Sequence, residues 1–244
     1  SIIMGNIYDN ETFFAEYGRM SRSAQGLSGA GEWHQLEPLF PPLQNSAVLD
    51  LGCGYGWHCK YAADHGAAEV LGLDASERMI GEALARNAHP RIRYEVQALD
   101  RYAYPAERFH LVISNLVLHY VEDLERVYRS VYRTLRPGGV FLFNIEHPVF
   151  TAGINEEWVL DGDGKPLYWP MDRYFFPGGR ETVFLGQRVV KQHHTLTQIL
   201  GGLLGAGFRL EAVEEVQPPE EMLGLPGMAD ELRRPMMLLV RARK

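Results

Sequence analysis

The sequence has little cysteine, no long apolar run and no excess of positive charge. Cys53 and Cys59 are the only cysteines among 244 residues, too few for a disulfide framework, which favours a reducing compartment. No apolar run approaches the ~20 residues of a membrane span, and Ser1–Asn10 lacks the layout of a signal peptide. We therefore expect a cytoplasmic protein with no membrane partner.

The charge balance is acidic. Lys and Arg number 24 against 31 Asp and Glu, a net charge of −7, whereas binding along a nucleic-acid backbone needs a basic surface. The hydrophobic share of 46% and the charged share of 23% are ordinary for a globular protein. A chain of this length accommodates one α/β domain with embellishments, so we expect a single domain and no nucleic-acid partner.

Alternating glycines stand between a predicted buried strand and a predicted helix. The apolar run before Gly52 holds a single acid, Asp50, and a helical pattern begins at Trp57. Gly52, Gly54 and Gly56 lie between them, and glycine is used where the backbone takes positive φ or a ligand approaches the main chain. The pattern predicts a cofactor loop at the carboxyl edge of an α/β sheet. The alternative is a tight turn without a ligand.

The chemistry of this loop favours one class of cofactor. A dinucleotide loop, Gly-x-Gly-x-x-Gly, packs its third glycine against the helix, where this chain has the bulky Trp57. A carboxylate at Asp50 suits a cationic group better than a pyrophosphate. The pattern Asp-x-Gly-x-Gly-x-Gly resembles motif I of the class I S-adenosylmethionine-dependent methyltransferases, whose cofactor carries a sulfonium and an ammonium group.

A second acid ends the next predicted strand, Glu69–Asp74, and Ser76 is placed to cap a helix that runs to Asn87. A carboxylate at this point of such a fold accepts hydrogen bonds from the ribose hydroxyls of a nucleotide. We expect Asp74 at the cofactor ribose, with a turn-forming role as the alternative.

Three later stretches continue the resemblance. The third predicted strand leads into Ala98-Leu99-Asp100, where the family holds adenine. Ala98 replaces the usual acid, which leaves the Leu99 backbone N–H as the expected ring contact and gives Asp100 either that role or a turn role. Phe109–Val121 resembles the fourth strand and its exit, and Leu135–Gly139 resembles the Leu-Arg-Pro-Gly-Gly signature before the fifth strand.

In order within residues 47–146, these motifs resemble the class I methyltransferases, in particular the type 11, ubiquinone/menaquinone-biosynthesis branch. The resemblance implies a doubly wound, mostly parallel, seven-stranded α/β sheet with an antiparallel last strand. It also implies in-line transfer of a methyl group from S-adenosylmethionine to a small-molecule acceptor, with S-adenosylhomocysteine as product. The cofactor-binding residues that it implies are Tyr17, Arg22, Asp50, Gly52, Cys53, Gly54, Asp74, Ala75, Met79, Leu99, Asp100, Ser114, Asn115 and Leu116.

Three further segments surround that core. Residues 1–46 predict a helical cap, which either covers the sheet edge or closes over the cofactor as a lid. Residues 147–188, rich in aromatic residues, Gly and Pro, read as a long structureless connection and hence a substrate lid, with a satellite core or a dimer contact as alternatives. Residues 189–244 are expected to add a strand, a helix and two closing strands, and the residues of that helix expected to face the sheet are Leu196, Ile199, Leu200, Leu203 and Leu204.

Titratable groups follow the strand ends on the acceptor side. A base is needed only if the acceptor must lose a proton. The candidate catalytic residues are His119, Glu146, His147 and His194, with Tyr174 and His193 nearby. Each has a structural alternative, because a histidine near a strand end often bonds a loop carbonyl. No set of side chains has metal-ligand spacing, so no metal is expected.

Two other functions stay open. A non-catalytic S-adenosylmethionine sensor or partner subunit would keep the cofactor motifs but lack an acceptor pocket. An NAD-dependent oxidoreductase is disfavoured by Trp57, and Ser114-Asn-Leu-Val117 does not match the Asn/Asp-Pro-Pro-aromatic motif of nucleic-acid amino-methyltransferases. The sequence leaves the acceptor open, and likewise the choice between monomer and homodimer.

Overall fold

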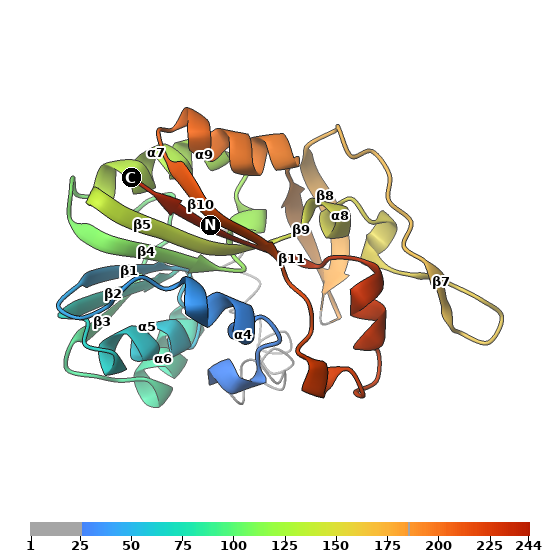
Figure 1. Cartoon of the computed structure of the whole chain (residues 1–244), viewed down its shortest axis with the longest axis horizontal. Helices are drawn as coiled ribbons and strands as arrows, with labels where there is room; N and C mark the ends of the chain where they lie inside the picture. Colours follow the sequence, from blue (N-terminus) through green and yellow to red (C-terminus); the bar gives the residue numbers. More distant parts are fainter. Residues whose placement is uncertain (1–25, 185) are drawn as a thin grey trace.

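The computed structural model describes residues 26–184 and 186–244, and it is built on one twisted sheet (Figure 1). The strands of this sheet are β1 (Ala47–Leu51), β2 (Glu69–Asp74), β3 (Ile92–Val96), β4 (Phe109–Asn115), β5 (Leu135–Glu146), β10 (Arg209–Glu215) and β11 (Met237–Arg243). Their order is β10-β11-β5-β4-β1-β2-β3. The pairs from β5 to β3 are parallel, and β11 is antiparallel to both of its neighbours. The expected doubly wound sheet with an antiparallel last strand is confirmed.

Helices cover both faces of the sheet (Figure 1). One face carries α4 (Trp33–Leu36), α5 (Trp57–Asp64) and α6 (Glu77–Arg86); the other carries α7 (Leu124–Thr134) and α9 (Gly202–Gly205). Alternate side chains of each strand enter two separate cores: Leu49 and Phe141 pack towards α7, whereas Val48 and Leu142 pack towards α5. Burial on both faces explains why these strands read as continuous apolar runs.

Several element ends follow the local chemistry of the sequence. Ser76 caps α6 by accepting the Met79 N–H at 3.2 Å, and Asp123 caps α7 by accepting the Arg126 N–H at 3.1 Å. The fifth strand was expected to begin after a turn at Arg136–Gly139. It begins instead at Leu135, which pairs with Phe109 of β4 before an irregularity in the register, and Gly138, with φ +82°, donates to the Lys244 carbonyl there.

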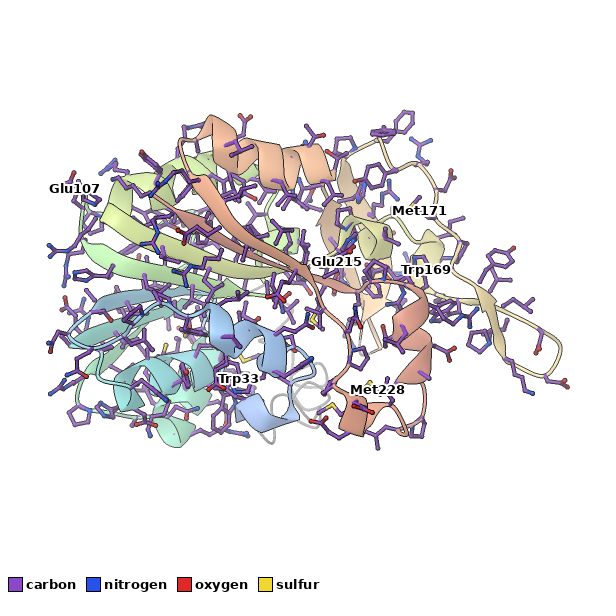
Figure 2. All side chains as sticks on the ribbon, viewed as in Figure 1. Trp33, Glu107, Trp169, Met171, Glu215 and Met228 are labelled. Carbon is purple, nitrogen blue, oxygen red and sulfur yellow. The ribbon has the colours of Figure 1, made fainter. Side chains whose placement is uncertain are left out.

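Residues 147–188 are not the structureless connection that the sequence suggested. They contain α8 (Pro148–Thr151), the 3-10 turn η4 (Ile154–Glu156), the hairpin of β6 (Val159–Leu160) with β7 (Pro166–Tyr168), and β8 (Gly178–Phe184), which pairs with β9 (Gln187–His193). This insertion lies beyond one end of the sheet, where Trp169 and Met171 are labelled in Figure 2. β6 and β7 are too short to show sustained alternation, and β8 opens on two glycines.

The helix after β9 is irregular. It begins as the π-helix η5 (Thr197–Gly201) and continues as α9, and the Thr195 hydroxyl accepts the Gln198 N–H at 3.2 Å as expected of a cap. Ile199 and Leu203 are buried, whereas Leu196 and Leu204 are 38% and 56% exposed. The predicted sheet-facing side is confirmed for Ile199, Leu200 and Leu203, which join the core. It is wrong for Leu196 and Leu204, because a π-turn shifts the spacing of the apolar face.

Candidate active site

The glycine loop between β1 and α5 needs its glycines for two different reasons. Gly52, Gly54 and Gly56 all have positive φ, of +72°, +56° and +84°, a region that costs other residues roughly 1–2 kcal/mol. A Cβ on Gly52 would collide with Val117, and one on Gly56 would collide with the Tyr94 hydroxyl, whereas one on Gly54 meets nothing. The loop is therefore packed closely on both sides, and Gly54 alone has open space beside it.

Asp74 ties this loop to the second strand. Its Oδ2 accepts the Gly54 N–H and its Oδ1 accepts the Ser76 N–H, both at 2.9 Å. The next residue is Ala75, and Met79 lies buried in the first turn of α6. Asp74, which the sequence predicts to bind the cofactor ribose, therefore lies against the glycine loop in the structure.

Asp50 lies beneath the loop and is almost completely buried. The Cys59 thiol donates to its Oδ2 at 3.4 Å, and its Oδ1 has no hydrogen-bond partner among the described residues. Burial above all, with the Asp74 charge adding to it, raises the pKa of Asp50 to about 7 against the opposing Cys59 hydrogen bond. Such a carboxyl is ionised most readily when a cation comes close.

A hollow of about 60 Å³ opens over the loop and is lined by Gly52, Cys53, Gly54, Trp57 and Asn115 among others. Two buried polar atoms at this hollow, Trp57 Nε1 and Asn115 Oδ1, lack hydrogen-bond partners among the described residues. One donor and one acceptor suit a group with a carboxylate and an ammonium. The residues present therefore fit the amino-acid end of S-adenosylmethionine.

The other cofactor candidates lie at the carboxyl ends of neighbouring strands. The Ser114 hydroxyl donates to the Leu51 carbonyl at 3.3 Å, and Leu116, with φ +59°, donates to the Asn144 carbonyl at 2.7 Å. Leu99 is buried and its carbonyl accepts the Tyr104 hydroxyl at 2.7 Å, whereas Asp100 is exposed. The remaining two candidates, Tyr17 and Arg22, lie outside the described residues.

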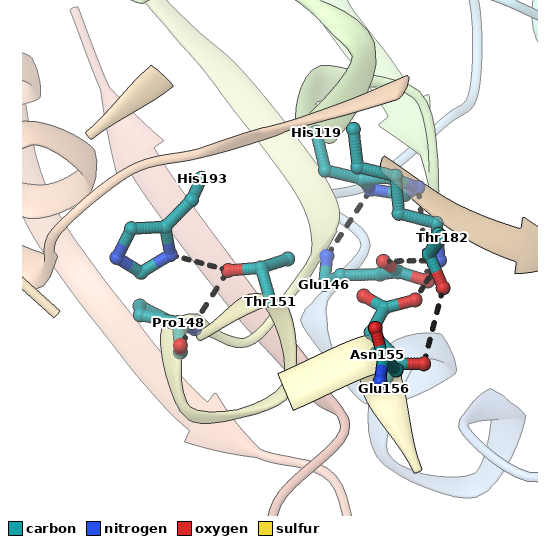
Figure 3. A network of polar contacts seen from close by, with 9 residues as sticks. His119, Glu146, Pro148, Thr151, Asn155, Glu156, Thr182 and His193 are labelled. Atoms are coloured by element: carbon teal, nitrogen blue, oxygen red, sulfur yellow. Dashed lines mark hydrogen bonds and ion pairs between the residues drawn. The ribbon is translucent and has the colours of Figure 1, made fainter. Parts of the chain in front are cut away.

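Four titratable side chains meet beyond the ends of β4 and β5 (Figure 3). Lys191 Nζ lies 2.8 Å from Glu146 Oε1 and 2.8 Å from Glu156 Oε1. His119, in the 3-10 turn η3 (Leu118–Tyr120), has its Nε2 3.9 Å from Glu146 Oε2. These four side chains are all at least nine-tenths buried, and we call them the acceptor-side cluster.

Hydrogen bonds set the protonation pattern of this cluster. The backbone N–H of Glu146 donates to His119 Nδ1 at 3.3 Å, so a neutral His119 carries its proton on Nε2 and presents an N–H there. Burial and the charge of Glu146 raise the pKa of Glu156 to about 7, opposed by Lys191. The pKa of Lys191 is raised because the two carboxylates outweigh its burial.

The other candidate histidines have hydrogen-bond partners outside the acceptor-side cluster. His147 Nδ1 accepts the Val149 N–H at 3.1 Å and its Nε2 lies 2.6 Å from Glu215 Oε2. His193 bridges the Thr151 hydroxyl and the Tyr174 carbonyl. His194 Nε2 donates to the Val121 carbonyl at 2.7 Å. The structure thus brings His119 and Glu146 together. His147 and His194 instead contact Glu215, Val149 and Val121.

Lys191 and Glu156 were not among the sequence candidates. The signal for Lys191 is the alternation of β9, in which Val189, Lys191 and His193 point inward and are buried. A lysine at an inward position of an alternating strand needs a partner. No comparable signal marks Glu156, which is in a short 3-10 turn.

Residues 26–184 and 186–244 contain neither a metal-ligand cluster nor a membrane-spanning helix. No group of three or more His, Cys, Asp and Glu side chains there is arranged to hold a metal ion. No helix in the same ranges is long and apolar enough to cross a membrane.

Known proteins resemble the chain both in part and over most of its length. The Methyltransferase domain family matches residues 49–143. The ubiquinone biosynthesis O-methyltransferase of Sinorhizobium medicae is 36% identical over 116 residues, which are 47% of this chain and 43% of that enzyme. The chain therefore matches less than half the length of that relative.

Two solved structures cover nearly the whole chain. A proposed S-adenosylmethionine-dependent methyltransferase from Listeria monocytogenes is 46% identical, with 90% of this chain and 99% of that one covered and a TM-score of 0.86. An S-adenosylmethionine-dependent methyltransferase from Mesorhizobium loti is 43% identical, with 90% and 100% covered and a TM-score of 0.82. Identity at this level over nearly complete chains, together with the glycine loop, shows the enzyme class and its methyl donor. The chain belongs to the S-adenosylmethionine-dependent methyltransferases.

Proposed function

We propose that this enzyme methylates a small molecule that presents a hydroxyl or amine group to the acceptor-side cluster. The observation that carries this proposal is the burial of His119, Glu146, Lys191 and Glu156 at the carboxyl ends of β4 and β5. Asn144 of β5 pairs with Asn115 of β4, and Asn115 lines the hollow over the glycine loop. Glu146 is two residues farther along β5 than Asn144, so it lies next to the cofactor site.

In this proposal the cofactor lies along the carboxyl edge of the sheet. The hollow at Trp57 and Asn115 holds its amino-acid end, Asp74 accepts its ribose hydroxyls, and the Leu99 turn holds its adenine. Methyl transfer is a displacement at an electrophilic sulfonium, so the main task of the protein is to aim the acceptor at the methyl carbon. When bound, S-adenosylmethionine supplies that activated methyl group.

The acceptor-side cluster orients the acceptor and manages its proton. Glu146 accepts a hydrogen bond from the hydroxyl or amine of the acceptor, and the Nε2–H of His119 donates to a neighbouring oxygen. Lys191 of β9 contacts both Glu146 and Glu156, and Glu156 belongs to the insertion, so the segment 147–188 acts as the lid that closes this side. A net charge of −7 agrees with a small molecule rather than a nucleic acid.

The test is transfer of an isotopically labelled methyl group from S-adenosylmethionine to a panel of phenols, quinols, amines and carboxylic acids. Labelled product is expected from members with a hydroxyl or amine. Glu146→Gln is expected to lower kcat by about 100-fold or more without changing the Kd for S-adenosylmethionine.

Two results would reject the proposal. An unchanged kcat in Glu146→Gln removes the cluster from acceptor binding. Tight cofactor binding with no transfer to any member of the panel favours the non-catalytic sensor.

A further inference from the structure

A cationic tip with two exposed phenylalanines projects from the insertion just before β8. Phe175 and Phe176 are 81% and 61% exposed. The Arg180 guanidinium donates to the carbonyls of Asp172, Arg173 and Phe176. These bonds close the loop upon itself, so the two rings are held outward rather than folded onto the core.

The charge of this tip, residues 173–180, is positive. The Arg173 guanidinium lies 4.3 Å from the centre of the Phe176 ring. Burial, and next the Arg173 charge, lower the pKa of Arg180, and only the Asp172 carboxylate opposes them. The tip therefore combines exposed apolar rings with two guanidinium groups, a pairing common where a protein contacts an acidic partner.

An acidic groove of about 650 Å³ lies beside the tip. The Tyr174 hydroxyl accepts the Leu196 N–H at 3.0 Å, and Leu196 begins the helix that forms one wall. Figure 1 shows the loop before β8 next to the end of this helix, which runs from η5 into α9. The groove is lined by Glu122, Asp123, Glu125, Arg129, Gly201 and Gly205 among others. These residues carry three carboxylates and one guanidinium, so the groove is acidic. The glycines leave backbone exposed along it.

A two-fold dimer joins the same surface patch of both protomers, and a protrusion next to a matching recess makes such a patch self-complementary. The tip and the groove are adjacent, opposite in charge, and opposite in shape. We propose that a second copy of this chain docks here, with the tip of each protomer entering the groove of its partner. Charge complementarity between Arg173 and the groove carboxylates selects this occupant.

Sedimentation equilibrium of the full chain over a dilution series tests the proposal. The wild type is expected to be dimeric, and Phe175→Ser with Phe176→Ser is expected to raise the dimer Kd at least about 100-fold, since each change acts at two symmetric contacts. Gly205→Leu should do the same by filling the groove, because an added Cβ there meets nothing. Leucine also favours helix over glycine, so the protomer keeps its fold.

Matched variants on the opposite face of the sheet are the controls. Gly81 of α6 also has nothing near an added Cβ, so Gly81→Leu should leave the dimer intact, as should Leu84→Ser. Arg173→Glu and Glu122→Lys should each weaken the dimer, and the double variant should restore it.

Three results would overturn the proposal. The first is a wild type that stays monomeric at every concentration, and the second is a dimer that is insensitive to the tip and groove variants. The third is a wild-type monomer that binds anionic phospholipid vesicles through Phe175 and Phe176, which would make a lipid surface the occupant.

Discussion

At the scale of single residues, Asp50 gives the cofactor-free enzyme a pH-dependent stability. Its folded pKa of about 7 lies above its ordinary value of 3.8, so between these values the folded chain binds more protons than the unfolded chain. The stability from this group is complete below about pH 4 and is lost as the pH rises towards about 7, by about 1.4 kcal/mol per pH unit. Asp50→Asn should remove this slope.

The measurement is urea unfolding of wild type and Asp50→Asn across that pH range, without cofactor. The difference between the two curves isolates Asp50, because all other titrating groups are shared. Parallel curves would contradict the assigned pKa. With S-adenosylmethionine bound, its positive charge should stabilise ionised Asp50 and flatten the wild-type slope.

Lys191 is the residue on which the acceptor-side cluster most depends for stability. Its ammonium contacts Glu146 and Glu156 at 2.8 Å with all three side chains buried. Lys191→Met removes the cation from two buried carboxylates, which should cost about 3–5 kcal/mol of unfolding free energy. Lys60→Met, at an exposed pair with Asp64, should cost less than about 1 kcal/mol. Equal effects in urea unfolding would show that the buried cluster is not an ion pair.

At the scale of elements, the strand–loop–helix unit tolerates a methyl group at one glycine and not at another. Gly54→Ala and Gly56→Ala both place alanine at positive φ, but only the second collides with the Tyr94 hydroxyl. Gly56→Ala should therefore lower the unfolding free energy by at least about 1 kcal/mol more than Gly54→Ala in urea unfolding without cofactor, because overpacking of a close contact typically costs about 1–3 kcal/mol.

Tyr94→Phe is the rescue for that clash. Without the hydroxyl, the double variant Gly56→Ala with Tyr94→Phe should recover most of the lost unfolding free energy relative to Tyr94→Phe alone. A double variant no better than Gly56→Ala would place the fault in the backbone angle rather than in the contact.

Elements with strong local signals were predictable, and those held by distant contacts were not. The strand Glu69–Asp74 and the Ser76 cap appear where their sequence pattern places them, since burial and capping are local. Lys191 reaches Glu146 from 45 residues away, and no local pattern encodes such a pairing. The insertion was missed for the same reason, because its strands are defined by pairing with each other or with β9 rather than by an alternating apolar pattern.

At the scale of the whole molecule, one buried cation joins the insertion to the closing segment. Arg234 lies just before β11, and its guanidinium is 4.3 Å from the centre of the Trp169 ring and 5.0 Å from that of Phe150. Its Nη1 lies 2.6 Å from Glu231 Oε2. Trp169 in turn donates from its indole N–H to the Val149 carbonyl, so the contact reaches the end of β5.

Arg234→Met should therefore loosen the insertion and leave the cofactor loop unaffected. The lost cation–π contacts are worth about 2 kcal/mol when desolvated, and unfolding free energy should fall by about that amount. Limited proteolysis should cut residues 147–188 faster, and the KM for the acceptor should rise while the Kd for S-adenosylmethionine stays constant. Arg243→Met, at a partly exposed pair with Glu211, is the control and should change none of these. A change in the Kd for S-adenosylmethionine alone would mean that the insertion and the cofactor loop are coupled through the sheet. The insertion would then not be an independent lid.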